Sequence, residues 1–473
     1  MLFNSFSFLI FLPLVCILYY MLPHKFRWLL LLLSSCYFYM AFVPLYILIL
    51  GFTIVVDYFA GIYIENSTGK RRKAFLVCSL IANIGVLAVF KYFNFINENL
   101  TSLMQSVGLV NQVPYLSILL PIGLSFHTFQ AMSYTIEVYR GHQKAERHFG
   151  IYSLYVMFFP QLVAGPIERP QNILHQFYEK HAFDYHNIVE GARLILWGFF
   201  MKVVVADRLA IYVNVLFDYP DLHNGTSLMV AAIFFTFQIY CDFAGYSKIA
   251  VGSARILGFD LMNNFERPFF SKSPSEFWKR WHISLSTWFR DYLYIPLGGN
   301  KVPLARNCVN LAFTFTISGL WHGASWNFII WGFLNGLYIV VDRLVNPLTK
   351  KWRNAASYGL LFRIGGRLLT FWLISLAFVF FRAKSLDYAL IIITKIFTSV
   401  GELYIPSPAQ LIFSLLAITI LMLSEFQAEF MQSKYAFFRS SNMLVRNIAY
   451  IVVIFLIMLI GVFDGGQFIY FQF

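Results

Sequence analysis

Residues 307–341 read NCVNLAFTFTISGLWHGASWNFIIWGFLNGLYIVV. Two apolar runs, 307–320 and 327–341, flank His322. The residues after His322 are small and permit a turn, and basic residues lie just outside both apolar runs. As a helix the first run would be about 21 Å long, whereas the hydrocarbon core of a bilayer is about 30 Å thick. We therefore expect a helical hairpin that enters the membrane from the cytosol and turns at His322, below the far surface.

The composition of the chain excludes a water-soluble globular protein. Of its 473 residues, 59% are hydrophobic and only 12% are charged, which is about half the charged fraction of soluble chains. Several apolar runs reach the length of about 18 residues that crosses a bilayer. We therefore predict an all-α polytopic membrane protein that occupies 1–473 as a single domain. Its core would cover about 115–345, flanked by transmembrane helices over 1–114 and 350–473.

We expect about ten to twelve transmembrane helices, together with re-entrant and amphipathic helices. Besides the hairpin, the predicted spans are 3–22, two helices within 28–64 divided near Pro44, 74–90, 115–136, 190–205, 226–244, 368–381, 409–424 and 446–462. Residues 150–166 are apolar but end in Gly165-Pro166, which predicts a re-entrant or interfacial element because proline cannot continue a helix.

Basic segments alternate with non-basic ones along the chain. Cytoplasmic loops of membrane proteins are enriched in Lys and Arg, so the basic segments at 24–27, 70–73, 140–149 and 343–353 are expected in the cytosol and the N-terminus outside. The same rule explains the net charge of +13 better than nucleic-acid binding does. The apolar N-terminus lacks a basic leading segment, and we expect it to be a retained span rather than a signal peptide.

Several kinds of catalytic and structural site have no sequence support. The five cysteines form no CxxC pair, so neither a disulfide framework nor a zinc site is indicated. The sequence also lacks an HExxH motif, which would indicate another kind of metal site. We therefore predict no metal and no cofactor. The absence of GxSxG, P-loop and GxGxxG motifs leaves a serine nucleophile or nucleotide hydrolysis without a basis.

Residues 273–299 differ from the apolar spans. Ser273 followed by Pro274 and Glu276 is typical of a helix start. Large apolar residues then recur at helical spacing, namely Phe277, Trp281, Leu285, Trp288 and Tyr292. We expect one amphipathic helix that lies along the membrane interface or packs against the bundle.

Two histidines are candidates for chemistry. An ionisable residue inside a bilayer is costly and is by default a functional hypothesis, and histidine suits proton transfer near neutral pH. His322 in the hairpin is the first candidate, although a buried histidine held by neighbouring helices is the alternative. His282 is the second, with an interfacial position at the edge of an aromatic face as its alternative. For His127, in an apolar span, packing is an equally good explanation.

Polar residues also interrupt the apolar span near 226–244. Gln238, Asp242 and Tyr246 lie close together there, and Gln161 precedes the Gly165-Pro166 segment. These side chains either line a polar cavity or form hydrogen bonds between helices, and the sequence alone leaves both open.

Several blocks resemble the membrane-bound O-acyltransferase (MBOAT) family, and more narrowly its bacterial alginate O-acetyltransferase branch. Residues 276–300, EFWKRWHISLSTWFRDYLYIPLGGN, resemble the family signature, and residues 319–324, GLWHGA, its catalytic histidine motif. Further similar blocks are LPIGLSF (120–126), AGPI (164–167), DFAGYS (242–247) and QFIYFQF (467–473). Branch members usually carry an acid after Gly-Tyr-Ser, where this chain has Lys248, so no role is carried over to that position.

The resemblance implies a helical bundle around a tunnel and an acyl transfer to a hydroxyl. His322 matches the family's catalytic histidine and His282 the second motif position. In this branch the expected donor is cytosolic acetyl-CoA, used as a substrate. The expected acceptor is a cell-surface glycan or a periplasmic partner acyltransferase, and the expected location is the inner membrane of a bacterium.

We predict that His322 is the general base and that His282 orients the donor or stabilises developing charge. The candidate substrate-binding residues are Trp321, Asp242, Gln238, Tyr246, Arg280, Arg290 and Asp291. The alternatives are an acyltransferase that moves D-alanine to teichoic acid or a fatty acid to a protein, and a glycan or lipid flippase that catalyses nothing.

Overall fold

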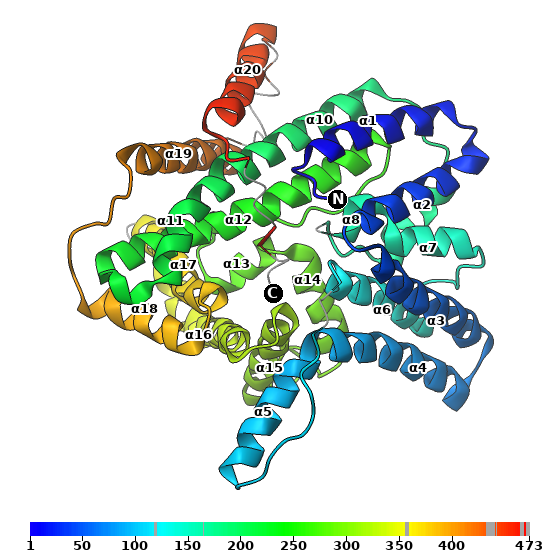
Figure 1. The fold of residues 1–473 in the computed structure, drawn as a ribbon, viewed down its shortest axis with the longest axis horizontal. Coiled ribbons are helices and arrows are strands. Elements are labelled where there is room, and N and C mark those ends of the chain that lie inside the picture. Colours follow the sequence, from blue (N-terminus) through cyan, green and yellow to red (C-terminus); the bar gives the residue numbers. More distant parts are fainter. Residues whose placement is uncertain are drawn as a thin grey trace. The chain divides into compact units, whose positions relative to one another are not determined.

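The computed structural model describes residues 1–117, 121–163, 165–354, 359–431, 440, 442–463 and 468–469. These residues form helices and connecting segments and contain no strand, which confirms the predicted all-α class (Figure 1). Parts of the quoted sequence blocks lie outside the described residues, namely 120, 164, 467 and 470–473, as do the side chains of 349–353.

The chain packs as two compact units, and the boundary between them falls inside two helices. Unit 1 comprises Met1–Ile195 and Ile249–Met262, and unit 2 comprises Leu196–Lys248 and Asn263–Phe473. The predicted single domain with a 115–345 core stays a prediction, because one domain can contain two such units.

Unit 1 begins with paired helices that the sequence largely predicted. Its α-helices are α1 (Phe6–Met21), α2 (His24–Met40), α3 (Ile47–Asn66), α4 (Gly69–Leu87), α5 (Phe93–Ser106), α6 (Leu124–Arg140), α7 (Phe149–Met157), α8 (Phe159–Leu162), α9 (Pro170–Ile173) and most of α10 (Tyr185–Phe199). The predicted break near Pro44 is confirmed, since a short 3₁₀ turn, Pro44–Tyr46, separates α2 from α3. The predicted loops 24–27 and 70–73 are instead the first turns of α2 and α4.

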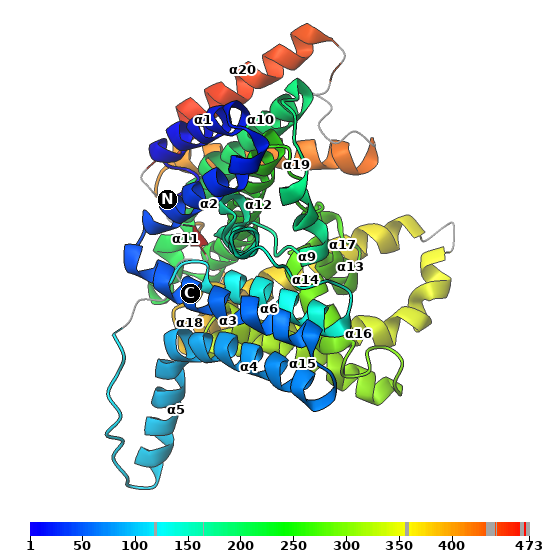
Figure 2. The same cartoon turned by 90° about the vertical axis from the view of Figure 1, so that its right-hand side faces the viewer.

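Two further segments of unit 1 depart from simple straight helices. The stretch after 149 is broken into the short helices α7 and α8, as expected of an element that does not cross the membrane as one helix. Helix α4 continues through a π-helical turn, Ala88–Tyr92, into α5. Figures 1 and 2 both show α5 turning sharply away from α4 after that turn, which is a common effect of π-helical turns.

Unit 2 holds the remaining helices. They are α11 (Asp207–Asp218), most of α12 (Gly225–Ile256), α13 (Pro274–Arg280), α14 (Ile283–Phe289), α15 (Leu304–His322), α16 (Trp326–Asn354), α17 (Gly359–Arg382), α18 (Leu386–Thr398), α19 (Pro408–Phe430) and α20 (Met443–Ile460), together with the π-helical segments Phe200–Ala206 and Arg290–Tyr294. The predicted loop 343–353 is helical instead, because α16 continues to Asn354 and includes Pro347.

Seven helical stretches of the described chain are long and apolar enough to cross a membrane. They are Pro44–Asn66, Gly69–Ser106, Gly225–Ile256, Trp326–Leu348, Gly359–Arg382, Pro408–Phe430 and Met443–Ile460. The predicted ten to twelve spans also count shorter apolar helices, such as α1 with its 16 residues. The chain is therefore a multi-pass membrane protein built of helices.

The predicted hairpin is present in unit 2. Helices α15 and α16 are joined by a short connection after His322 and pack closely along one another. Three glycines allow this approach: a Cβ on Gly319 would lie 2.2 Å from the carbonyl oxygen of Phe328, and one on Gly332 would lie 2.3 Å from that of Phe315. Gly336 faces Ala312 in the same way. The hairpin is thus closed by direct contact between helix backbones.

Candidate active site

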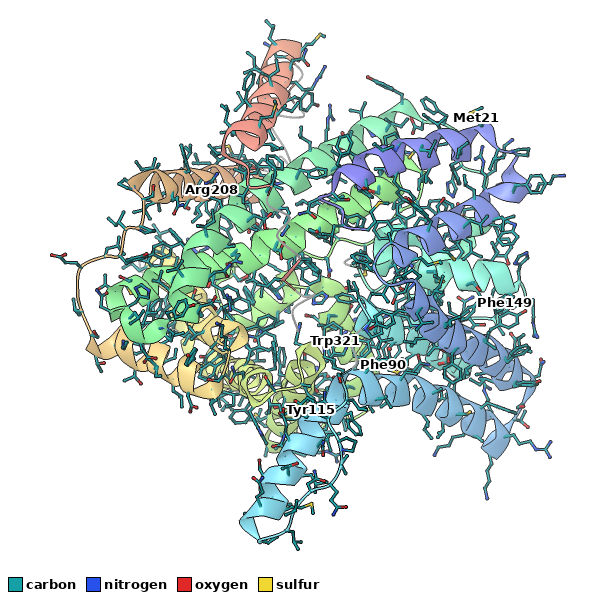
Figure 3. The ribbon with its side chains drawn as sticks, viewed as in Figure 1. Met21, Phe90, Tyr115, Phe149, Arg208 and Trp321 are labelled. Carbon is teal, nitrogen blue, oxygen red and sulfur yellow. The ribbon has the colours of Figure 1, made fainter. Side chains whose placement is uncertain are left out.

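His322 is the last residue of α15, and its imidazole is enclosed by aromatic rings. The residue is 4% exposed. The rings of Trp331 and Phe381 meet it edge-on, with centroids 4.9 and 5.4 Å away, and that of Trp321 lies 4.9 Å away. Trp321 is labelled in Figure 3. These rings belong to α15, α16 and α17, so aromatic side chains from three helices enclose one titratable group.

His282 lies beside His322, although 40 positions separate them in the sequence. Their ring centroids are 6.3 Å apart, and Trp321 lies 6.2 Å from His282. His282 is fully buried, with the ring of Phe243 of α12 edge-on at 4.7 Å. The structure therefore brings together the two histidines and the tryptophan that the sequence singled out.

The backbone at His282 corrects the prediction of one amphipathic helix over 273–299. The segment is broken into α13, α14 and the π-helical turn Arg290–Tyr294. His282 forms the break with φ 42° and ψ 56°, in the left-handed region. The predicted start is confirmed, since the Ser273 hydroxyl accepts a hydrogen bond from the Glu276 N–H. Helical spacing alone could not reveal the break, because large apolar residues are buried on both sides of it, namely Phe277 in α13 and Leu285 and Trp288 in α14.

The protonation state of His282 follows from its burial. Burial lowers the pKa of its imidazole to about 3, because a charged ring loses hydration in such a site. His282 lies outside the seven candidate spans. Its ring is therefore neutral at physiological pH and a weak base, since a good general base has a pKa near the working pH. The predicted division of roles, with His322 as base and His282 as an orienting group, stays a prediction.

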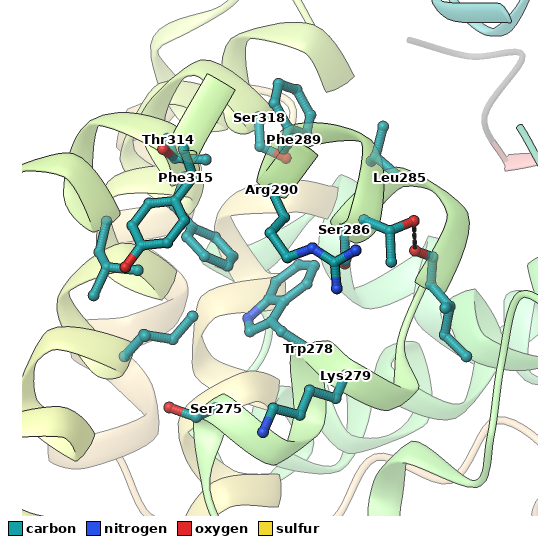
Figure 4. Close-up of a pocket in the computed structure, with 15 residues that line it drawn as sticks. Ser275, Trp278, Lys279, Leu285, Ser286, Phe289, Arg290, Thr314, Phe315 and Ser318 are labelled. Atoms are coloured by element: carbon teal, nitrogen blue, oxygen red, sulfur yellow. Dashed lines mark hydrogen bonds between the residues drawn. The ribbon is translucent and has the colours of Figure 1, made fainter. Parts of the chain in front are cut away.

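A cavity of about 450 Å³ lies against the hairpin, and its lining residues do not include His322 or His282. It is lined by α13, α14 and α15 and by Ile339 of α16, mostly with apolar groups. Lys279 and Arg290 supply positive charge at its wall, as Figure 4 shows. The lining residue Ser318 lies one helical turn before His322.

Aromatic contacts also connect the cavity to the histidine. Trp278 lines the cavity, and its ring lies 5.8 Å from that of Trp331, which in turn contacts His322. The sequence analysis missed Lys279, Thr314 and Ser318. A usable signal existed for Thr314 and Ser318, because they are polar residues placed eight and four positions before His322 on one helix face.

Asp242 and Tyr246 lie in a buried polar cluster. The Asp242 carboxylate is 2.7 Å from the Lys202 ammonium and accepts a hydrogen bond from the Ile469 N–H at 2.6 Å. Lys202 also pairs with Asp207 at 2.7 Å, and it lies 5.6 Å from the Tyr246 ring centroid. These contacts tie α12 to the π-helical segment Phe200–Ala206, and substrate binding by Asp242 and Tyr246 stays a prediction. Lys202 was missed, although a lone charge inside an apolar run was a signal.

The remaining candidates occupy different surroundings. Arg280 binds Glu276 of its own helix at 2.7 Å and Glu429 of α19 at 3.0 Å. Gln238 is buried in α12, and its Oε1 has no hydrogen-bond partner among the described residues. Arg290 is mostly exposed and pairs with Asp291 at 2.7 Å. Of these four, only Arg290 lines the cavity.

The sequence was compared with those of known proteins, and the result agrees with the family motifs found in it. Residues 142–382 match the model of the MBOAT, membrane-bound O-acyltransferase family. The chain belongs to the membrane-bound O-acyltransferase family. It is therefore an O-acyltransferase, and the family's polytopic membrane character matches its apolar helices.

Three relatives narrow the comparison. A probable alginate O-acetylase, AlgI, of Azotobacter vinelandii is 38% identical over 82% of this chain and 75% of its own length. A peptidoglycan O-acetyltransferase of Helicobacter pylori is 35% identical over 76% of this chain and 72% of its own. A teichoic acid D-alanyltransferase of Streptococcus thermophilus is 32% identical, but over only 47% of this chain and 56% of its own.

Among the described residues, no group of three or more His, Cys, Asp or Glu side chains is arranged to hold a metal ion.

Proposed function

We propose that this enzyme transfers an acetyl group from acetyl-CoA to a hydroxyl outside the cytoplasm, at the inner membrane of a bacterium. The acceptor would be a polysaccharide of the cell surface or a periplasmic partner acyltransferase that passes the acetyl group on. The proposal is supported by relatives named for the O-acetylation of alginate and of peptidoglycan. A D-alanine donor is the second candidate, and the shorter match to a D-alanyltransferase favours it less.

The observation that carries the mechanism is the buried pair His322 and His282, whose ring centroids are 6.3 Å apart. His322 accepts the proton of the acceptor hydroxyl as the oxygen attacks the thioester carbonyl of the donor. The new C–O bond forms as the C–S bond breaks, and the departing thiolate takes a proton from the imidazolium of His322. The neutral His282 ring orients the donor or stabilises the charge that develops on the carbonyl oxygen.

The cavity suits the donor rather than the glycan. Its apolar lining can receive the acyl and pantetheine portions, and Lys279 and Arg290 can attract the phosphates of CoA. The basic ends of the hairpin favour the cytosolic side for that entry. A flippase does not need a histidine that aromatic side chains of three helices enclose.

His322→Gln tests the mechanism, because glutamine keeps hydrogen-bonding capacity and approximate size but cannot take the proton. We expect acetyl transfer per inserted molecule to fall at least about 100-fold, the usual loss for a missing general base. The assay measures transfer from labelled acetyl-CoA to the glycan in membranes that contain the partner proteins, normalised to inserted enzyme. Retention of more than about a tenth of the activity would overturn the assignment of His322 as base.

A matched control is His127→Gln in unit 1. His127 is 1% exposed in α6, and its Nε2 lies 2.5 Å from the Thr53 hydroxyl. We expect this variant to accumulate less but to keep its activity per molecule.

The second candidate is tested with a D-alanyl-loaded carrier in place of acetyl-CoA. If the enzyme transfers D-alanine from this carrier and no acetyl group from acetyl-CoA, the carrier and not acetyl-CoA is the donor.

A further inference from the structure

We infer that Asn264 is a positioning residue, which holds the His282 ring against His322 by clamping the backbone after His282. The inference rests on the proposed function, because it concerns the geometry of the same pair of histidines. Asn264 precedes α13 by ten positions and is only 2% exposed. It lies in unit 2, together with both histidines.

Three hydrogen bonds form the clamp. The carbonyl oxygen of Asn264 accepts from the Ile283 N–H at 2.9 Å. Its side-chain Oδ1 accepts from both the N–H and the hydroxyl of Ser284, at 3.2 and 3.0 Å. The N–H groups of Ile283 and Ser284 directly follow His282 and belong to the first turn of α14. The N–H groups in the first turn of a helix have no hydrogen-bond partner within that helix, so they need acceptors from elsewhere.

The neighbours of Asn264 hold the other side of the break. The Glu266 N–H donates to the Arg280 carbonyl at 2.9 Å, just before His282. Between these anchors the ring of Phe265 lies nearly parallel to that of His282, with centroids 6.4 Å apart. The segment 264–266 therefore holds the chain before and after His282 and also contacts its imidazole.

A clamp is needed because the conformation of His282 is intrinsically unfavourable. Side chains other than glycine resist positive φ, so a free chain would relax to the right-handed helix. In that case α13 and α14 would join into the single helix that the apolar spacing of 273–299 suggests. The Cβ of His282 would then point elsewhere, and its ring would leave His322. The left-handed backbone thus depends on a partner that is distant in sequence.

Two substitutions separate positioning from bulk stability. Asn264→Ala removes the Oδ1 acceptor and leaves the two buried donors of Ser284 without their partner. Asn264→Asp keeps the acceptor and the size, and it loses no hydrogen bond, because Nδ2 of Asn264 has no acceptor among the described residues. We expect Asn264→Ala to lower kcat at least about 10-fold with KM for acetyl-CoA changed by less than about twofold, and Asn264→Asp to recover most of the loss.

The matched control is Asn310→Ala in α15. Asn310 is another buried asparagine, and its amide donates to the Leu297 carbonyl at 3.1 Å. We expect this variant to lose abundance with an unchanged kcat per inserted molecule. If Asn264→Ala behaves like Asn310→Ala, or if Asn264→Asp is as slow as Asn264→Ala, Asn264 is structural and the inference is wrong.

A second measurement keeps this result apart from the proposed function. Amide hydrogen exchange of residues 280–288 in the full-length protein reports the clamp without any reaction. We expect faster exchange there in Asn264→Ala and no change in Asn310→Ala. Unchanged exchange in Asn264→Ala overturns the clamp even if the enzyme transfers acetyl groups. Faster exchange with no acetyl transfer by the unmodified enzyme retains the clamp and overturns the proposed reaction.

Discussion

His322 and His282 lie side by side, yet the chain brings them there by two different kinds of local structure. His322 ends a regular helix in a hairpin that is closed by glycines on both helices. His282 interrupts a periodic sequence with a left-handed residue. The first arrangement depends on neighbours along the same two apolar runs. The second depends on a distant segment, so the two histidines should respond differently to local substitutions.

The close packing of α15 against α16, which positions His322, can be disrupted at Gly332. A Cβ there would lie 2.3 Å from the Phe315 carbonyl oxygen and 2.9 Å from the Gly319 Cα. Backbone atoms cannot yield as side chains do, so we expect Gly332→Val to separate α15 from α16 and to destabilise the protein by about 3 kcal/mol, the upper end of the usual cost of overpacking. Inserted protein and its thermal midpoint in detergent, measured by fluorescence-detected size exclusion, check this.

Gly365→Val in α17 is the control for that substitution. No heavy atom lies within 4 Å of a Cβ built at Gly365, so the same side chain enters open space in another apolar helix. We expect nearly unchanged abundance for it. If Gly332→Val accumulates like Gly365→Val, close backbone contact does not hold the hairpin, and the position of His322 needs another cause.

The contrast between the histidines also shows how much the sequence could predict. The hairpin turn at His322 was predictable, because apolar runs, small residues and basic ends are all local features. The short connection near Pro44 followed from the missing N–H of proline. The two histidine blocks were found through family motifs, although nothing in their spacing indicated that the rings would lie 6.3 Å apart.

Other features could not be read from local patterns. The break at His282 is stabilised by Asn264, and a periodic pattern does not register such a distant partner. The engagement of Asp242 by Lys202 and by the Ile469 N–H joins three separate segments. The cavity is a property of packing between α13, α14 and α15, so no local pattern linked Lys279 to the lining residues of the other two helices.

Two substitutions that both remove the imidazole test whether the native packing retains the left-handed backbone at His282. Asparagine tolerates the left-handed region, whereas a β-branched residue is a strained outlier there. We expect His282→Asn to keep the thermal midpoint of the unmodified protein. His282→Val should lose about 1–2 kcal/mol, the typical cost of that conformation. Thermal midpoints in detergent distinguish the two variants.

Activity adds a second readout to the same pair of variants. Because both lack the ring, both should transfer acetyl groups more slowly than the unmodified enzyme, whatever their stability. Equal midpoints for His282→Asn and His282→Val would show that the left-handed backbone is not retained by the native packing. Full activity in His282→Asn would show that the imidazole takes no part in the reaction.

The smallest expected effect concerns Arg290, where the His282 segment meets the cavity. Its side chain is 59% exposed and pairs with Asp291, so its attraction for a donor phosphate acts largely through water. Exposed charge pairs contribute about 0.2–1 kcal/mol. We therefore expect Arg290→Gln to raise KM for acetyl-CoA by only about two- to fivefold, with kcat unchanged.

Salt and a control variant separate this effect from a general change in charge. Lys301→Gln removes an exposed positive charge that does not line the cavity, and we expect its KM to stay near that of the unmodified enzyme. Raising the ionic strength to about 1 M shortens the Debye length to about 3 Å, which should abolish the difference between Arg290→Gln and the unmodified enzyme. If KM is unchanged in Arg290→Gln at low salt, donor phosphates do not pass this residue. If Lys301→Gln shifts KM equally, the charge of the whole face attracts the donor, and the cavity wall has no special part in binding it.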